Sequence, residues 1–476
     1  MECMHLTTEN NMASMIYQAV INHPDRVAIY TPTHKELNAP HTELTYAAFA
    51  EQVRDFQRAL ELYQLKEKDH VLIVALPQGS LFALITALLA KKLIPVFIDP
   101  RMGYRKIRQV LRETPLAAAI WGNKWRFWHY FLPELWKVPA YSVDTLEKRA
   151  LETKLDAKTE QTASIKKEEF PFTLLPCHAD DTAVITYTSG TTGLPKGADR
   201  THGKMVKQFQ ILHELAPPLE NDIGLTFLPT AVIHGLSLGM TSVIPALDLL
   251  RSHQFQPELI CNQLKNLSVT CCGGSPFFIA ALADYLEKNN LSLPSLRLIV
   301  IGSAGAHPQL LIQLSRILPN TEIVICYGAS EAEPIAVVHG ADIIAEYDQE
   351  TIGRGYLVGE ICAPLLVRIV QSTVLDDMLQ NPDALIEIDH LNLPIDEIGE
   401  IVVSGPQVTD KYTNPLVSME KKFYDSNGRL WHRTADRGCF DHKNKLWLTG
   451  RCGDQVIMNG KEIDPFALEI FIDSLP

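Results

Sequence analysis

Short apolar runs alternate with longer helical patterns through roughly the first three hundred residues, and this alternation restricts the possible folds more than any other feature. Apolar runs of strand length are typical of parallel strands that are buried on both faces of a sheet. Between them, stretches such as YAAFAEQVRDFQRALELY at 46–63 repeat their apolar residues at helix spacing. We therefore expect an α/β fold with doubly wound sheets. The runs are HVLIVAL from His70, LIPVFIDP from Leu93, AVITYT from Ala183, LRLIVIG from Leu296 and TEIVICYG from Thr321.

The character of the sequence changes along the chain. A single hydrophobic core rarely grows beyond about 250 to 300 residues, so a chain of 476 residues should contain several. The polar stretch 152–170 has the composition of a connection, and from about Ile352 short alternating strands separated by turn residues predominate. We predict two doubly wound αβα subdomains at 1–170 and 171–345, and a smaller β-barrel-like subdomain at 346–452. A hinge and the start of a truncated C-terminal domain should follow at 453–476.

Charge and composition limit the partners. The chain has 43 Lys and Arg against 56 Asp and Glu, a net charge of −13, which argues against a broad surface for nucleic acid or anionic membrane. Any site for a polyanion should therefore be local. We expect no nucleic-acid partner and no transmembrane segment. The nine cysteines show no metal-ligand spacing and no signal peptide is apparent, so we expect a cytoplasmic protein.

The stretch YTSGTTGLPKG at 187–197 has the composition of a phosphate-binding loop. It follows a strand-like run, and hydroxyls, backbone amides and a lysine can all donate to phosphate oxygens. The spacing is not that of a Walker loop, because no Ser or Thr follows the lysine. The plainer alternative is an ordinary surface loop. The hydroxyls are those of Thr188, Ser189, Thr191 and Thr192, the lysine is Lys196, and the glycines are Gly190, Gly193 and Gly197.

The same stretch resembles a known signature. TSGTTGLPKG, followed by Thr201-His202, is similar to the phosphate loop of the AMP-forming adenylate synthetases, which include acyl-CoA synthetases, luciferases and peptide-synthetase adenylation domains. CYGASEAEPIA from Cys326 is similar to the Tyr-Gly-x-[Thr/Ser]-Glu signature of that family. In the family this tyrosine packs on adenine, the hydroxyl contacts phosphate and the glutamate binds magnesium. An aromatic face is suited to packing on a purine, and a carboxylate is suited to binding Mg²⁺.

Weaker landmarks follow in the family's order along the whole chain. LPTAVIHGLSLGM from Leu228 resembles the acyl-pocket segment, and IGSAGAHP from Ile301 resembles the loop beside adenine. The latter is no GxSxG nucleophile elbow, because Ile stands at 301. In WHRTADRG the family's Thr-Gly-Asp is changed, with Ala435 in place of the glycine. LTGRCGDQVIMNGKEIDPFALE resembles the hinge, with Gly453 where many relatives carry Asp or Lys.

The resemblance implies a set of roles for residues of this sequence. ATP and Mg²⁺ would be required, with a small carboxylic acid as substrate and CoA or an acyl-carrier thiol as a further partner. The implied residues are Lys196, Thr188 and Glu331 for catalysis, with Thr188 and Glu331 at the metal; Ser189, Gly190, Thr191, Thr192, Gly193, Ser303, Ala304, Gly305, Tyr327, Gly328, Ser330, Asp436 and Arg451 for the nucleotide; and His234 and Gly274 for the acyl pocket.

The activity implied is activation of a carboxylic acid to an acyl-adenylate with release of pyrophosphate, followed by transfer to CoA or a carrier thiol. The segments SAGA, GPQVTDKYTNP and GRLWHR resemble those of the olefin-pathway β-lactone synthetases. The alternative to acyl transfer is therefore closure of a 3-hydroxyacyl-adenylate to a β-lactone. A fatty-acyl substrate is favoured over an amino acid.

Relatives usually continue with a mobile domain of roughly a hundred residues, which carries a catalytic lysine. Only 23 residues follow Gly453 here, and Lys461 should not take that role. Loss of such an electrostatic contact typically lowers a rate about 10²- to 10³-fold. An alternative of another class therefore stays open, in which the chain binds nucleotide without turnover and regulates a partner.

Overall fold

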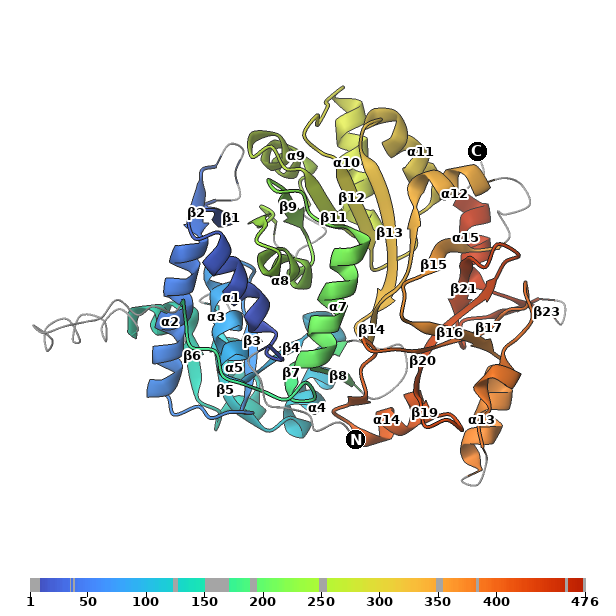
Figure 1. Ribbon diagram of the computed structural model, residues 1–476, viewed down its shortest axis with the longest axis horizontal. Coiled ribbons are helices and arrows are strands. Elements are labelled where there is room, and N and C mark those ends of the chain that lie inside the picture. The colour runs from blue at the N-terminus through green and yellow to red at the C-terminus, as the bar shows by residue number, and fades with distance from the viewer. Residues whose placement is uncertain are drawn as a thin grey trace, which may run out of the picture. The chain divides into compact units, whose positions relative to one another are not determined.

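A computed structural model of the protein describes residues 9–34, 36, 39–122, 127–149, 171–188, 195–247, 255–347, 354–381, 385–458 and 461–473. The chain divides into two compact units. Figure 1 labels most of the helices and strands described below. The first unit comprises Met1–Leu259 and Tyr412–Asn414, and the second comprises Ile260–Lys411 and Pro415–Pro476. The domain boundaries expected from the sequence, at 170, 345 and 452, stay predictions.

The first unit contains a mostly parallel sheet with the strand order β8-β7-β4-β3-β5-β6. All neighbours pair in parallel except β7 and β8, which form an antiparallel pair. These strands arise from the apolar runs of the sequence, as expected for a sheet covered on both faces. They are β3 (His70–Val74), β4 (Ile94–Ile98), β5 (Leu116–Trp121), β6 (Ala140–Ser142), β7 (Thr182–Thr188) and β8 (Lys196–Thr201).

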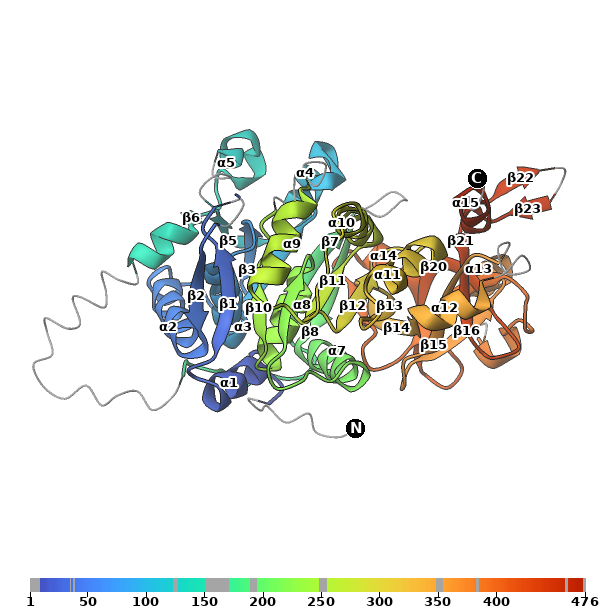
Figure 2. The same cartoon turned by 90° about the horizontal axis from the view of Figure 1, so that it is seen from above.

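Both faces of this sheet are buried. On β3, Val71 and Ile73 join the large core formed with α1 to α3, while Leu72 between them joins a second core that contains Leu111 of α4. This alternation follows from the two-residue period of a strand. Figure 2 shows α4 and α5 on one side of these strands and α1 on the other. The elements that cover the sheet are α1 (Ala13–Asn22), α2 (Tyr46–Leu62), α3 (Gly79–Ala90), η1 (Pro100–Met102), α4 (Tyr104–Glu113), α5 (Trp128–Phe131) and η3 (Pro133–Leu135).

A smaller group of strands completes the first unit. Here β9 (Ile223–Thr226), β10 (Thr241–Val243) and β1 (Val27–Pro32) pair in parallel, and β2 (His41–Thr45) adds an antiparallel edge. Helix α7 (His202–Leu215) follows β8 directly, and Thr201 caps it by accepting from the backbone N–H of Lys204. The remaining helices are α8 (Pro229–Ser237) and α9 (Pro257–Asn266), the latter crossing the division between the units.

The second unit begins with three parallel strands, β11 (Cys271–Gly274), β12 (Leu298–Gly302) and β13 (Glu322–Ala329). From β13 onward every further pair is antiparallel, in the order β13-β14-β15-β21-β20-β17-β16. The helices beside the parallel part are α10 (Pro276–Lys288), α11 (Pro308–Ile317) and α12 (Gly340–Glu346).

The antiparallel strands come from the short alternating segments after residue 352 and from the hairpin partner of β13. Among the described residues they form an open run rather than a closed ring. The strands are β14 (Ala332–His339), β15 (Tyr356–Ile361), β16 (Leu366–Val370), β17 (Gly399–Ser404), β19 (Lys422–Tyr424), β20 (Leu430–Phe440) and β21 (Leu446–Arg451). The remaining elements are α13 (Ser372–Gln380), η5 (Ile388–Leu391), β18 (Lys411–Tyr412), α14 (Pro415–Lys421), β22 (Val456–Met458), β23 (Lys461–Ile463) and α15 (Pro465–Asp473).

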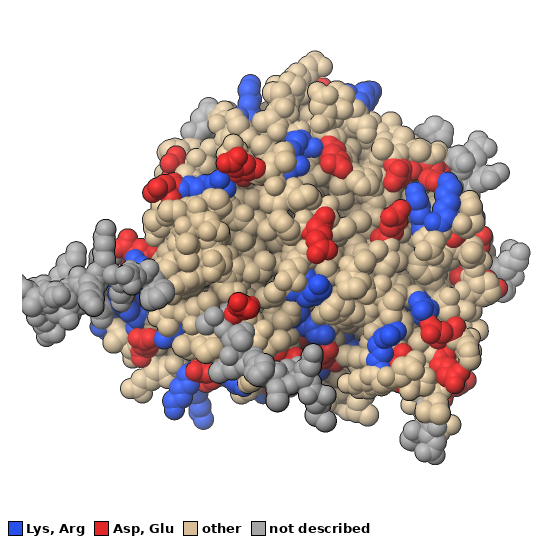
Figure 3. All heavy atoms as spheres, viewed as in Figure 1, with Lys and Arg blue, Asp and Glu red and all other residues tan. Residues whose placement is uncertain are grey.

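The expected α/β class, with large sheets and a β-rich part, is confirmed. On the face drawn in Figure 3, basic and acidic side chains are interspersed, with no broad field of one sign. Within the described residues, no helix combines the length and apolarity that crossing a bilayer requires.

Candidate functional site

The β7–β8 hairpin of the first unit holds the two ends of the predicted phosphate loop. Thr188, the last residue of β7, pairs with Lys196, the first residue of β8. A hydroxyl and an ammonium group are thus fixed at the mouth of the hairpin, at the carboxyl end of a parallel strand, where α/β sheets bind ligands. The other loop residues, Ser189, Gly190, Thr191, Thr192 and Gly193, lie outside the described residues.

The glycine of the Pro-Lys-Gly sequence is required by packing inside the first unit. A Cβ atom on Gly197 would lie 2.4 Å from the Thr413 hydroxyl and 2.6 Å from the Tyr187 ring. Tyr187 is itself fixed, because its hydroxyl lies 2.9 Å from Thr114 Oγ1 and 3.0 Å from Thr413 Oγ1. Gly197 therefore lets the base of the hairpin close against an aromatic ring, a contact that sequence alone does not reveal.

The Thr201-His202 pair has structural roles. Thr201 caps α7, and the fully buried His202 accepts a hydrogen bond at Nδ1 from the backbone N–H of Met12 at 3.1 Å. Burial lowers the pKa of His202 to about 4, so its ring is neutral at neutral pH. The pair thus anchors the helix that follows the phosphate loop.

His234 lies on α8, where its ring packs 4.9 Å from the ring of Phe209. Burial lowers the pKa of His234 to about 4, and its Nε2 has no hydrogen-bond partner among the described residues. A neutral imidazole against an aromatic ring suits an apolar pocket. It equally suits a purely structural histidine, so its place in an acyl pocket stays a prediction.

Three strand ends of the second unit meet at one edge of its sheet. Gly274 ends β11 and pairs with Ile301 of β12, and Gly302 pairs with Cys326 of β13. Because the three strands are parallel, Gly274, the loop that starts at Ser303, and the Tyr327-Gly328 pair all lie toward the same carboxyl edge. The second unit therefore gathers the nucleotide residues predicted from two motifs, with Gly274 one strand away.

Asp436 is the centre of a buried polar cluster at this edge. Its carboxylate accepts from the Tyr327 hydroxyl at 2.8 Å and from Arg451 Nε at 3.0 Å, although 109 residues separate Tyr327 from Asp436. Burial raises the pKa of Asp436 above its ordinary value, and the Arg451 guanidinium counteracts part of that rise. Burial, and next the Asp436 carboxylate, raise the pKa of Tyr327. The backbone N–H of Asp436 donates to Thr434 Oγ1 at 3.0 Å, which fixes the strand locally.

Ser330 and Glu331 form the turn that joins β13 to β14, with Ala329 and Ala332 paired across it. Thr409 N–H donates to the Glu331 carbonyl at 2.8 Å and holds the turn. No group of three or more His, Cys, Asp or Glu side chains that could hold a metal occurs in the described part of the chain. A single carboxylate still fits Mg²⁺ that is bound mainly by phosphate oxygens and water.

The Ser303-Ala304-Gly305 loop is exposed and has an unusual backbone. Ser303 has φ of +70°, a conformation that non-glycine residues adopt rarely and often at functional sites. Behind the loop, a Cβ atom on Gly305 would lie 2.6 Å from the Tyr356 ring. Tyr356 in turn packs at 5.4 Å from the Phe466 ring of α15. A rigid aromatic ring thus supports the loop from below, and no sequence motif indicated Tyr356.

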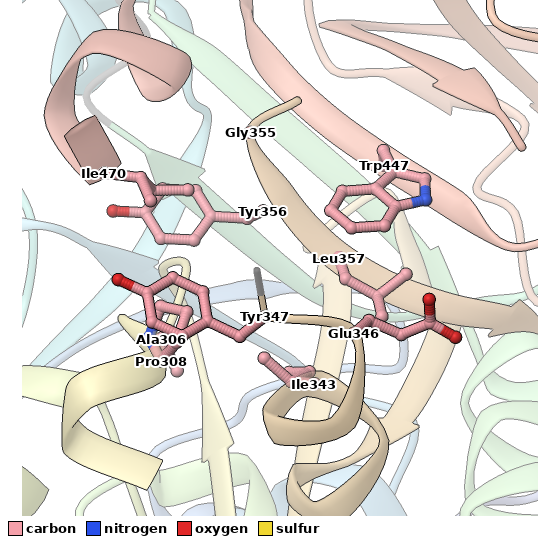
Figure 4. A pocket seen from close by; sticks show the side chains of 10 residues that line it. All are labelled: Ala306, Pro308, Ile343, Glu346, Tyr347, Gly355, Tyr356, Leu357, Trp447 and Ile470. Carbon is pink, nitrogen blue, oxygen red and sulfur yellow. The ribbon is translucent and has the colours of Figure 1, made fainter. Parts of the chain in front are cut away.

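A cavity of about 20 Å³ lies beside this aromatic support (Figure 4). Figure 4 shows the Tyr347 and Tyr356 rings side by side, with Ile470 above them and Trp447 opposite. A single water needs about 10 to 15 Å³ and drug-sized ligands need about 300 to 1,000 Å³. This cavity is therefore a packing gap between α15 and the sheet, and it is too small for a nucleotide.

The predicted hinge follows β21. Gly453 has φ of +92° and nothing within 4 Å of an added Cβ, so a pivot there needs glycine for its backbone and not for space. Asp464 connects the segment after the hinge to the sheet, accepting from Arg437 Nε at 2.9 Å and from Thr449 Oγ1 at 3.0 Å. Sequence reasoning missed Asp464, although an Asp-Pro pair before a helix is a usable signal. The side chain of Lys461 lies outside the described residues.

Comparison with known proteins gives matches along most of the chain. The profile of a family described as AMP-binding enzyme matches residues 16–413. The chain is 28% identical over 456 residues to an olefin beta-lactone synthetase from Xanthomonas campestris pv. campestris, covering 94% of this chain and 79% of that protein. It is 25% identical over 467 residues to a 2-succinylbenzoate–CoA ligase from Bacillus cytotoxicus, covering 98% of this chain and 83% of that one.

Solved structures share the fold. O-succinylbenzoate coenzyme A synthetase from Bacillus subtilis, in complex with ATP and magnesium ion, superposes with a TM-score of 0.72. The sequence identity is 20%, and the match covers 94% of this chain and 82% of that chain.

Proposed function

Because this chain belongs to the AMP-binding enzyme family and is an AMP-forming ligase, we propose that it activates a fatty or 3-hydroxy fatty acid with ATP. A carboxylate oxygen of the acid attacks the α-phosphorus, the bond from that phosphorus to the bridging oxygen breaks, and pyrophosphate leaves. The product is an acyl-adenylate. The observation that supports this most is the buried Asp436 carboxylate, held by Tyr327 and Arg451 at the edge where strand ends gather. Such an acceptor suits the two hydroxyls of a ribose.

Each proposed role follows from the chemistry of the side chain. Thr188 and Lys196, together with the loop between them, would hold the phosphates of ATP by hydrogen bonds and charge. Glu331, at the β13–β14 turn, would hold Mg²⁺, with Thr188 as the second proposed ligand. Mg²⁺, when bound, neutralises phosphate charge. The Ser303-Ala304-Gly305 loop, Gly328 and Ser330 would line the nucleotide, and His234 and Gly274 the acyl chain.

For the second step we favour closure of a 3-hydroxyacyl-adenylate to a β-lactone. The 3-hydroxyl oxygen attacks the acyl carbon, AMP leaves, and the hydroxyl proton passes to solvent. The match to an olefin beta-lactone synthetase over 94% of the chain supports this outcome. Transfer of the acyl group to CoA or a carrier thiol is the second candidate, supported by the match to a CoA ligase over 98% of the chain.

A single experiment separates these outcomes. ATP–pyrophosphate exchange is measured with a panel of fatty, 3-hydroxy fatty and amino acids, and ATP binding is measured in parallel. AMP release is also measured, with and without CoA. Release of AMP that requires the 3-hydroxyl group and no thiol supports lactone closure, whereas release of AMP only with added CoA supports transfer. Exchange with no acid, in protein that binds ATP, contradicts acid activation by this chain and favours a nucleotide-binding regulator.

Replacing Lys196 with alanine, or Glu331 with glutamine, should lower the rate of exchange at least tenfold. Each change removes an electrostatic contact to the phosphates or their metal, a class of contact typically worth about 10²- to 10³-fold in rate. Lys207→Ala, on the same unit but on α7, is the matched control and should leave exchange unchanged. Normal exchange in both site variants would refute these two roles.

Replacing Gly305 with alanine should weaken ATP binding about tenfold, because the added methyl group would meet the Tyr356 ring and displace the loop. Removing the ring as well, in Gly305→Ala/Tyr356→Ala, should recover part of the loss. Titration calorimetry of the single and double variants gives the coupling between the two positions. Additive losses would show that Tyr356 does not support this loop.

A further inference from the structure

Between β5 and β6 the first unit displays a group of exposed aromatic side chains. Tyr130 is 70% exposed, Trp136 64% and Phe131 60%, values that are unusual for residues of this size. Isolated exposed aromatics need no explanation, but these lie within one short segment and on the helix packed against it. This aromatic patch consists of Tyr104, Phe127, Trp128, Tyr130, Phe131 and Trp136.

The segment that carries the aromatic patch is packed against the first unit and hydrogen-bonded to it. Leu132 and Leu135, from the same segment, are buried in the core that contains Leu111 and Trp121. The Tyr104 hydroxyl donates to the Phe131 carbonyl at 2.9 Å, and Trp136 Nε1 donates to the Tyr130 carbonyl at 3.3 Å. Folding therefore buries the leucines and leaves the aromatic rings facing solvent.

Basic residues are frequent in the stretch of chain that carries the aromatic patch, although the protein has a net charge of −13. Arg108 Nε and Arg112 Nε share the single carboxylate of Glu134, at 2.8 and 3.0 Å, so two guanidinium groups face one carboxylate. Described residues between 99 and 137 include six Lys or Arg against three Asp or Glu. They are Arg101, Arg105, Lys106, Arg108, Arg112 and Lys137 against Asp99, Glu113 and Glu134.

We propose that the aromatic patch docks on the surface of a lipid bilayer that contains anionic lipids. Aromatic side chains settle at the boundary between headgroups and acyl chains, where Trp and Tyr keep their polar atoms wet. Flanking Lys and Arg are attracted to the negative surface of such a bilayer. A protein partner would be expected to offer acidic groups to the cations and a shaped surface to the rings. A bilayer supplies negative charge and an apolar layer and needs no complementary shape, which fits a group of exposed rings beside basic side chains.

The test uses sedimentation with sucrose-loaded vesicles, either of pure phosphatidylcholine or with about one third phosphatidylglycerol. We expect binding to the anionic vesicles that weakens with added salt. Tyr130→Ser/Phe131→Ser/Trp136→Ser and, separately, Arg105→Glu/Lys106→Glu should each weaken binding at least tenfold. Phe277→Ser, which removes a 59% exposed aromatic ring from α10 in the second unit, is the matched control and should bind normally. ATP binding should be unchanged in all variants and confirms that they fold.

Three results would overturn the proposal. The first is no binding of the unmodified protein to anionic vesicles, and the second is an equal loss in Phe277→Ser. The third is a change of sedimentation coefficient, in the triple variant without vesicles, that shows loss of a dimer, since a second copy of the chain would then cover the aromatic patch. None of these measurements depends on acid activation.

Discussion

Replacing Asp436 with alanine is expected to weaken ATP binding about a hundredfold, measured by titration calorimetry. Two ribose hydroxyls would each lose a hydrogen bond to a charged acceptor, and such bonds contribute about 1.5 to 3 kcal/mol apiece. Together they amount to at least about 3 kcal/mol, and each 1.4 kcal/mol is a factor of ten in affinity. Arg451, which is half exposed, would be released into water when its carboxylate partner is removed.

Two conservative variants separate binding from stability. Asp436→Asn keeps the shape of the side chain but loses its charge, so its affinity for ATP should lie between those of the unmodified protein and Asp436→Ala. Tyr327→Phe keeps the ring proposed to contact adenine and removes only the donor at 2.8 Å, so it should lose less than about tenfold. If Asp436→Ala binds ATP as tightly as the unmodified protein, Asp436 is not the ribose acceptor.

The pH dependence of Asp436 has a definite sign. Its folded-state pKa is raised above 3.8 by burial, so ATP affinity should begin to fall at a higher pH than for an ordinary aspartate. For the same reason the ionised carboxylate lowers folding stability at neutral pH, and that loss disappears as pH falls through the raised pKa. Asp436→Asn should therefore not lower the unfolding free energy at pH 7. Affinity that stays flat down to pH 4 would contradict the raised pKa.

Much of the fold was predictable because the signals are local. The strand runs at 70, 93, 183, 296 and 321 all became strands, and the change to antiparallel pairing occurs after β13, near the change of texture read from the sequence. The alternation of Val71, Leu72 and Ile73 between two cores follows from strand geometry once both faces are covered. The order of strands in each sheet depends on contacts between distant segments and was not predictable.

The proposed site was predictable only through its resemblance to a family. Nothing in the local sequence says that Tyr327 will reach Asp436 across 109 residues, yet the motifs named both. Two features had no signal: Tyr356 supports Gly305, and Tyr187 requires Gly197. Ala435, which replaces the family's glycine, has φ of +62°. A left-handed alanine is strained by roughly 1 kcal/mol, which gives the family's glycine a physical reason.

Loss of Arg433 should strongly destabilise the second unit. Its guanidinium donates Nε to Glu400 Oε1 at 3.1 Å and Nη2 to Oε2 at 2.5 Å, and Nη1 lies 2.5 Å from Asp376 Oδ1. Glu400 is only 1% exposed, so Arg433→Met would leave a carboxylate buried without its partner. Breaking a buried pair in this way typically costs about 3 to 5 kcal/mol. Hydrogen exchange of the β17 and β20 amides, followed by mass spectrometry, measures the expected fall in opening free energy.

Two further variants test whether the loss of stability comes from the broken ion pair or from lost packing of the arginine side chain. In Arg433→Met/Glu400→Leu no ion is left buried, so the double variant should recover most of the loss, because buried pairs replaced together by apolar groups of similar volume are often close to neutral in stability. Arg316→Met is the matched control, since Arg316 is 67% exposed and its partner Glu287 is 38% exposed, and it should change stability by less than about 1 kcal/mol. If the double variant is no more stable than Arg433→Met, the loss comes from the packing of the arginine stem against its neighbours, and the ion pair between β17 and β20 contributes little.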